Sequence, residues 1–169
     1  IILSGDQICK QDYADFLRFH KEKGAEFSVA VMEVDWKEAS RFGLMVADEN
    51  DKITEFQEKP PVPKSNLASM GIYIFNWDVL KKYLEEDEAD PNSKNDFGMN
   101  IIPALLRDGR KMYAYHFNGY WRDVGTIDSL WEANMEVLDP ENSGIDIFDK
   151  KWKIYSRNPV LPAQKIGPR

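Results

Sequence analysis

The sequence lacks the features that mark secreted, membrane-spanning and nucleic-acid-binding proteins. Its single cysteine, Cys9, excludes a disulfide within the chain and fits a reducing cytoplasm, the compartment we expect. No run comes near the roughly 20 apolar residues that cross a bilayer, so we predict no membrane contact. The 22 lysines and arginines are outnumbered by 29 aspartates and glutamates, and the net charge of −7 argues against nucleic-acid binding.

Glycine-rich phosphate loops are also missing. The 10 glycines are scattered, and neither G-x-G-x-x-G nor G-x-x-x-x-G-K-[ST] occurs among them. We therefore expect that this chain cannot hold a triphosphate by itself. Hydrophobic residues still make up 43% of the sequence, which is enough for one globular domain with a core.

The sequence does contain alternating buried strands and amphipathic helices. Residues 1–3 have the composition of a fully buried strand, and a helix at 12–23 and a strand at 27–34 complete a βαβ pattern. Further strands are predicted at 44–47, 53–57, 67–75, 112–117 and 120–124, with helices after Asn76, at 100–107 and after Thr126, and an exposed loop at 87–96. This order predicts an α/β fold with a mostly parallel mixed sheet flanked by helices. Because a buried strand needs neighbours on both sides and no Met precedes Ile1, we expect the domain to be incomplete at its N-terminal side.

Two acidic residues lie where strands are expected to end. Asp6 follows the first strand, and Asp123 precedes a glycine turn and the helix that Thr126 caps. Ligands bind at the carboxyl ends of strands in open α/β sheets, and two carboxylates there could hold Mg²⁺. The same residue types are equally common in simpler roles: Asp6 begins a turn, or Asp123 pairs with Arg122 or Lys52 at the surface.

Four further positions are candidates for contact with a phosphorylated substrate. Lys59 can neutralise a phosphate and Glu58 can accept hydrogen bonds from hydroxyl groups, although a solvated strand end is the commoner use of such a pair. Ser69 is a lone hydroxyl in an apolar strand and needs a partner, for which a backbone carbonyl is the usual choice. Gly43 permits close approach to a ligand or simply starts a strand, and His20 is interpreted as a packing residue.

Six segments occur in an order that is typical of one enzyme family. They are LSGD (3–6), EASRFG (38–43), FQEKP (56–60), SNLASMGIY (65–73), DFG (96–98) and YWRDVGT (120–126). In register, and with the match extending to about Pro168, they closely resemble bacterial glucose-1-phosphate adenylyltransferases. The resemblance implies a Rossmann-like nucleotidyltransferase domain that makes ADP-glucose and pyrophosphate from ATP and glucose 1-phosphate, using Mg²⁺.

The same resemblance implies roles for individual residues. Asp6 and Asp123 would hold the catalytic Mg²⁺. Glucose 1-phosphate would be bound by Gly43, Glu58, Lys59 and Ser69, with Trp121 close to the sugar. Phosphoryl transfer depends on positioning and charge neutralisation, which these residue types supply.

The resemblance also implies how the chain is organised. Residues 1–145 would form the C-terminal part of the catalytic domain, and 146–169 a linker toward a left-handed β-helix domain. That domain would serve oligomerisation, as a homotetramer or hetero-oligomer, and allosteric control of a step toward glycogen. The family's glycine-rich loop would precede Ile1, so we expect this fragment alone to be inactive.

Two other functions remain open from the sequence. A sister enzyme that uses dTTP or UTP would share most of these residues, and only the ASMG and WRD segments favour the adenylyl enzyme. A protein without catalytic activity is the other possibility, either a regulatory subunit of the same fold or a binding or scaffold module. The regulatory subunit is disfavoured because Lys59 and both aspartates are present, and the binding module would be tested by whether glucose 1-phosphate shifts the melting temperature.

Overall fold

The computed structural model describes residues 1–155. The strands are β1 (Gln7–Cys9), β2 (Phe27–Glu33), β3 (Gly43–Ala47), β4 (Ile53–Glu58), β5 (Leu67–Phe75), β6 (Met112–His116) and β7 (Trp121–Asp123). The helices are α1 (Tyr13–Glu22), α2 (Trp77–Ala89), α3 (Ile102–Arg107), α4 (Ile127–Val137) and α5 (Pro140–Ser143), with a 3₁₀ turn η1 (Ala39–Arg41) and a π-helical turn η2 (Phe97–Ile101). None of the helices in this part of the chain is long and apolar enough to span a bilayer.

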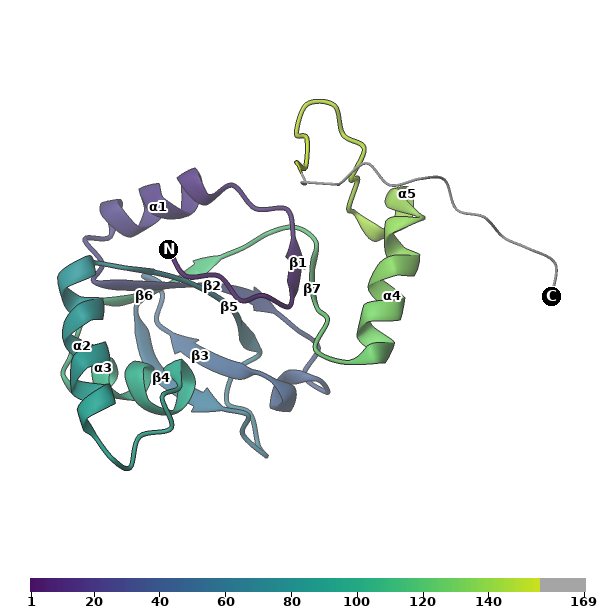
Figure 1. The fold of residues 1–169 in the computed structure, drawn as a ribbon. Coiled ribbons are helices and arrows are strands. Elements are labelled where there is room, and N and C mark those ends of the chain that lie inside the picture. Colours follow the sequence, from purple (N-terminus) through teal and green to yellow (C-terminus); the bar gives the residue numbers. More distant parts are fainter. Residues whose placement is uncertain (156–169) are drawn as a thin grey trace, which may run out of the picture.

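The main sheet has five strands in the order β4-β3-β5-β2-β6 (Figure 1). The α/β class and the mixed sheet flanked by helices are confirmed, but the prediction that the sheet is mostly parallel is wrong. Only β2 and β6 run parallel, while the other three pairs are antiparallel. The β3–β4 connection is too short for a parallel crossover, and a tight turn with Asp51 at φ 66° reverses the chain there.

The first residues form less structure than predicted. Ile2 makes one antiparallel bridge, to Tyr73 of β5, and its neighbours Ile1 and Leu3 are 61% and 51% exposed. The prediction of a fully buried strand is therefore wrong for this segment, because it is paired along one side only. Since β5 is antiparallel to β2, the segment does run parallel to β2, with β5 between them.

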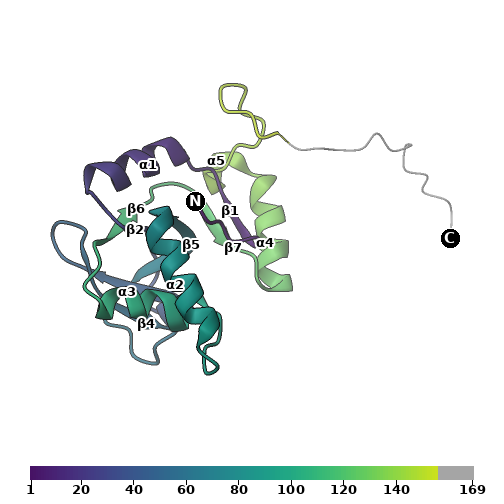
Figure 2. The same ribbon diagram turned by 60° about the vertical axis from the view of Figure 1, so that its left-hand side comes forward.

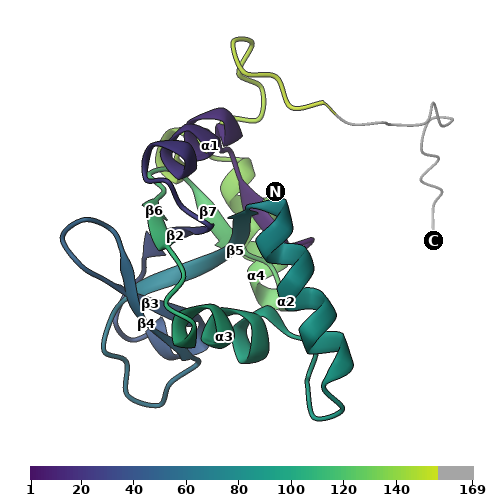
Figure 3. The same cartoon turned by 90° about the vertical axis from the view of Figure 1, so that its left-hand side faces the viewer.

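Helices cover both faces of the main sheet (Figures 1 and 3). Phe16 of α1 packs on one face, against Ala30, Met70, Ile72 and Ile74. On the opposite face, Tyr83 of α2 and Leu105 of α3 join a larger core. That core includes Phe27, Val29, Val31, Met45, Ile53, Ile101, Ile102, Met112 and Ala114. Strand side chains alternate between the two faces, so β5 can bury every second residue under α1 and direct the others toward the opposite side.

Two of the helix starts that the sequence predicts are capped by side chains, and a third is not. Asp12 caps α1 through a 2.8 Å bond from the Ala14 N–H, and Thr126 and Ser129 form a capping box on α4. Asn76 precedes α2 but makes no side-chain cap. Its amide instead binds His20 and the carbonyl of Ala25.

Two segments differ from their predicted bounds. The loop expected at 87–96 begins later, because α2 continues to Ala89. The helix expected at 100–107 is divided into η2 and α3, with Pro103 near the start of α3, where its missing N–H is tolerated.

The α4 helix lies beside the short β1–β7 ribbon, apart from the main sheet (Figure 2). The proposed division at residue 145 remains a prediction. Ile145 is buried, and residues 146–155 form neither helix nor strand. Asp149 pairs with Lys10 at 3.0 Å, which attaches this segment to the chain just after β1. The remainder of the predicted linker, 156–169, lies outside the described residues.

Candidate active site

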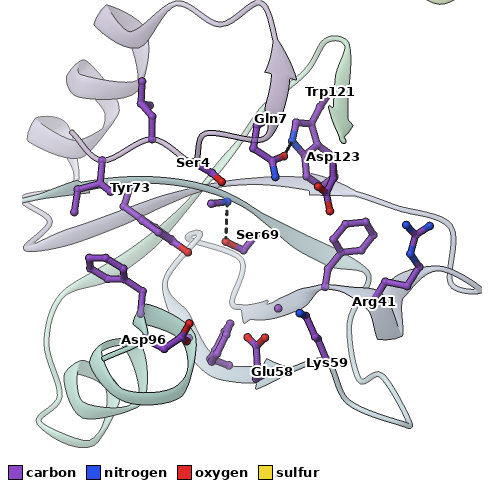
Figure 4. A pocket seen from close by; sticks show the side chains of 18 residues that line it. Ser4, Gln7, Arg41, Glu58, Lys59, Ser69, Tyr73, Asp96, Trp121 and Asp123 are labelled. Carbon is purple, nitrogen blue, oxygen red and sulfur yellow. Dashed lines mark hydrogen bonds between the residues drawn. The ribbon is translucent and has the colours of Figure 1, made fainter. Parts of the chain in front are cut away.

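A cavity of about 440 Å³ lies between the main sheet and the β1–β7 ribbon. Its size is within the usual range for small-molecule sites. Six of the seven predicted site residues line it, namely Gly43, Glu58, Lys59, Ser69, Trp121 and Asp123. Figure 4 shows Gln7, Trp121 and Asp123 on one side of the cavity and Glu58, Lys59 and Asp96 on the other.

The seventh residue, Asp6, lies at the edge of this cavity next to Asp123. The two carboxylates flank Gly125: a Cβ placed there would lie 3.3 Å from Asp123 Oδ1 and 3.7 Å from Asp6 Oδ2. The two aspartates were expected at neighbouring strand ends of the main sheet, and that expectation was wrong. Asp6 precedes β1 and Asp123 ends β7, so an antiparallel ribbon brings them together rather than two parallel strand ends.

Each of the two carboxylates has one oxygen held by the protein. Asp6 Oδ1 accepts from the Ser4 hydroxyl at 2.5 Å and from the Gln7 amide at 3.2 Å. The bond from Ser4, more than any other contact, lowers the pKa of Asp6. Asp123 Oδ1 accepts from the Gly125 N–H at 3.1 Å. The second oxygen of each aspartate has no hydrogen-bond partner among residues 1–155.

This donor set fits Mg²⁺. Within residues 1–155 no group of three histidine, cysteine or acidic side chains is placed to hold a metal ion alone. Mg²⁺ commonly uses one or two carboxylates and completes its octahedron with water and substrate phosphate oxygens. Two adjacent aspartates with free oxygens at the edge of a pocket match that requirement.

The surface pairing considered for Asp123 does not occur in the described residues. Arg122 points to the other face of the ribbon, because alternate residues of a strand face opposite sides. There it pairs with Glu132 and Glu136 of α4. Arg122 thus fastens the helix to the ribbon and leaves Asp123 free toward the cavity.

The Glu58 carboxylate packs against two glycines. A Cβ at Gly98 would lie 2.6 Å from Glu58 Oε2, and one at Gly43 would lie 3.0 Å from the same atom. Partial burial of the carboxylate raises the pKa of Glu58; the charge of Lys59 opposes this effect and the charge of Asp96 adds to it. Glu58 Oε2 therefore lies between the two glycines, in the wall of the cavity.

Two cations border the same cavity. Lys59 has φ 43°, an unusual backbone conformation for a residue with a side chain, and its N–H binds the carbonyl of Phe42. Such conformations are costly and concentrate at functional sites. Arg41 also lines the cavity; within residues 1–155 it lies over the Phe42 ring, 5.7 Å from the centroid, and its one ion pair is an exposed one with Glu38, at 3.1 Å. Exposed pairs of this kind are weak, so Arg41 is available to an anion.

Ser69 lies in the part of β5 that faces the cavity. Its hydroxyl oxygen accepts from the Gly71 N–H at 3.2 Å, rather than donating to a carbonyl as expected. Gly71 has φ 68°, and a Cβ there would lie 3.2 Å from the Ser4 Cβ, so the chain needs glycine at this crossing.

Trp121 is held by contacts on two sides. Its ring packs against Phe42, with centroids 5.4 Å apart, and its indole N–H donates to Gln7 Oε1 at 2.5 Å. Gln7 therefore contacts both Trp121 and Asp6, a link that was not predicted.

Several other lining residues were also missed. They are Ser4, Arg41, Tyr73, Asp96, Phe97 and Gly98. All six belong to the segments LSGD, EASRFG, SNLASMGIY and DFG, and the order of those segments was the one signal that could have identified them.

Comparison with known proteins shows which enzymes this chain is similar to. A family described as nucleotidyl transferase matches residues 1–140. Proteins called glucose-1-phosphate adenylyltransferase are similar to 99% of the chain, at 65% identity in Clostridium beijerinckii, 63% in Clostridium acetobutylicum and 60% in Desulforamulus reducens. The chain spans 43%, 44% and 42% of these relatives, respectively, which is less than half of their length.

Proposed function

The chain belongs to the nucleotidyl transferase family, and from this premise we propose that it forms the sugar-phosphate and Mg²⁺ site of a glucose-1-phosphate adenylyltransferase. In the full-length protein, an oxygen of the glucose 1-phosphate phosphate group attacks the α-phosphorus of ATP. The bond between the α- and β-phosphates breaks, ADP-glucose forms and pyrophosphate leaves. The product would serve glycogen synthesis in the cytoplasm.

One observation carries the proposal: two aspartates with free oxygens border a cavity whose opposite wall holds Glu58 and Lys59. Lys59 neutralises the phosphate of the sugar, and the oxygens of Glu58 accept hydrogen bonds from sugar hydroxyls. The Trp121 ring supplies an apolar wall beside the sugar. When bound by Asp6 and Asp123, Mg²⁺ supplies charge neutralisation at the reacting phosphates.

This division of roles fits the chemistry. Phosphoryl transfer is accelerated chiefly by alignment and by stabilisation of negative charge, without a covalent nucleophile from the protein. The described pocket offers cationic, acceptor and carboxylate groups in a small volume. Binding of the triphosphate, oligomerisation and allosteric control are assigned to the rest of the full-length protein.

The test is pyrophosphate release by the full-length protein with glucose 1-phosphate, Mg²⁺ and one of ATP, dTTP or UTP. ATP should be strongly preferred, and Asp123→Asn should lower the rate at least about 100-fold, because a charged ligand of the cation is lost. Preference for dTTP or UTP would reassign the protein to a sister enzyme. Absence of activity with all three nucleotides would favour the regulatory-subunit alternative.

A further inference from the structure

Three side chains of the β1–β7 ribbon line the cavity, those of Gln7, Trp121 and Asp123. In the ribbon, Gln7 is paired with Asp123, and Cys9 with Trp121. Gln7 and Trp121 are thus diagonal neighbours on one face of the ribbon, a relation that long side chains can bridge. From this position the Gln7 amide reaches Trp121 Nε1 at 2.5 Å and Asp6 Oδ1 at 3.2 Å.

The two partners allow only one orientation of the Gln7 amide. An indole N–H can only donate, so the atom facing Trp121 must be the carbonyl oxygen. An ionised carboxylate can only accept, so the atom facing Asp6 must be the NH₂ group. The reversed amide would oppose two donors at one end and two acceptors at the other. The bond to Trp121 therefore orients the Gln7 amide for its bond to Asp6, and the bond to Asp6 orients it for Trp121.

We propose that Gln7 is a positioning residue that sets the Asp6 carboxylate and the Trp121 indole relative to each other. The proposal rests on the function proposed above, in which Asp6 lies at the cation end of the site and Trp121 at the sugar end. Gln7 and Ser4 together occupy Asp6 Oδ1 and thereby direct Oδ2 toward Asp123. The indole is held between Gln7 and Phe42, which leaves its ring as a fixed wall of the cavity.

A consequence is that the two ends of the site are coupled. Loss of the indole donor frees the Gln7 amide to rotate, and the Asp6 carboxylate then loses a donor although Trp121 is no ligand of the cation. Loss of Gln7 itself frees both partners. Substitution at either residue should therefore change both the Mg²⁺ and the glucose 1-phosphate dependence.

Three variants of the full-length protein test this coupling. Gln7→Met keeps the length of the side chain and removes both hydrogen bonds. Gln7→His supplies one acceptor and one donor nitrogen when neutral, so it should restore part of the function. Gln11→Met makes the same change at a glutamine outside this cavity, whose amide has no partner among residues 1–155, and is the matched control.

The first readout needs no catalysis. In protein labelled with fluorotryptophan, the fluorine NMR signal of Trp121 is identified by its loss in Trp121→Phe. We expect this signal to move in Gln7→Met and to stay in place in Gln11→Met. We also expect added Mg²⁺ to shift it in the wild type and to shift it less in Gln7→Met.

The second readout is the rate of pyrophosphate release. In Gln7→Met, the KM for glucose 1-phosphate and the Mg²⁺ concentration at half-maximal rate should each rise roughly three- to tenfold, as expected for the loss of one or two neutral or singly charged hydrogen bonds. Trp121→Phe should also raise the Mg²⁺ requirement, and the double variant should show less than the product of the two effects, because the residues act together.

The proposal is overturned if the Trp121 signal is unmoved in Gln7→Met, or if Trp121→Phe leaves the Mg²⁺ requirement unchanged. Should Gln7→Met not fold, Trp121→Phe still decides between the outcomes, since it breaks the same link from the other end. A wild-type protein without activity would refute the proposed function alone. In that case the NMR signals still show whether Gln7 holds Trp121.

Discussion

In the full-length protein, the proposed function predicts that Gly98→Ala weakens glucose 1-phosphate binding without unfolding the protein. The added Cβ would lie 2.6 Å from Glu58 Oε2. An ordinary carbon–oxygen contact is about 3.4 Å, so the carboxylate has to move by roughly 0.8 Å. A displacement of about 1 Å at a reacting centre can cost about 100-fold in rate. We therefore expect kcat/KM for glucose 1-phosphate to fall about 10- to 100-fold.

The effect of Gly98→Ala on stability should be small. Gly98 lies in the helical turn η2, where alanine is favoured over glycine by up to about 1 kcal/mol. Moving the Glu58 side chain off its rotamer costs about 0.5–1.5 kcal/mol, so the two effects largely cancel. Gly43→Ala is the instructive comparison, because its Cβ would also lie 2.9 Å from the Phe56 ring, which packs against the core. That variant should lose both binding and stability.

The assay is pyrophosphate release by the full-length protein at varied glucose 1-phosphate, with thermal melting of the same preparations. Wild-type kcat/KM in Gly98→Ala would show that the glycine does not set the position of Glu58. A melting temperature that falls as far as in Gly43→Ala would also refute the reasoning, since the loss of activity would then follow from unfolding.

Three further predictions concern stability. Burial lowers the pKa of His20, so the folded protein favours the neutral ring. The folded protein therefore keeps its full stability above the unfolded pKa of about 6.5 and loses stability as the pH falls below that value. Thermal melting should show this loss in the wild type but not in His20→Gln. Gln11→Met should raise the melting temperature, because a buried amide without a described partner costs about 1–3 kcal/mol; a lower value would contradict this. Thr126→Ala should cost about 1 kcal/mol and speed amide exchange in α4, whereas Thr126→Ser should change neither.

Most of the elements could be predicted because their signals are local. The alternating strand β5 was found with its observed bounds, and the caps Asp12 and Thr126 marked the starts of α1 and α4. Strand direction could not be predicted in the same way, because apolar runs of similar composition occur in parallel and antiparallel buried strands. The three-residue strand β1 is too short to produce a recognisable periodicity and was not predicted, whereas β7 lies within the strand predicted at 120–124.

In the candidate site, too, some residues could be predicted from the sequence and others could not. Glu58, Lys59 and Asp123 have side chains whose chemistry suggests a role before any fold is known. The roles of Gln7 and Gly98 come from contacts with residues distant in sequence, Trp121 and Glu58. A glutamine and a glycine carry no charge or reactive group that would have singled them out.

The β1–β7 ribbon affects the order in which the parts of the structure form during synthesis. It joins residues 114 positions apart, as in the bond between Gln7 and Trp121. Closing such a long loop costs more chain entropy than the short β3–β4 connection does, so the ribbon is expected to form late. During synthesis, the wall that carries Glu58 and Ser69 can therefore be complete while β7 has yet to emerge from the ribosome. A nascent or truncated chain would contain Asp6, Glu58 and Ser69 and would lack Trp121 and Asp123, so the cavity would be open on one side until the domain is finished.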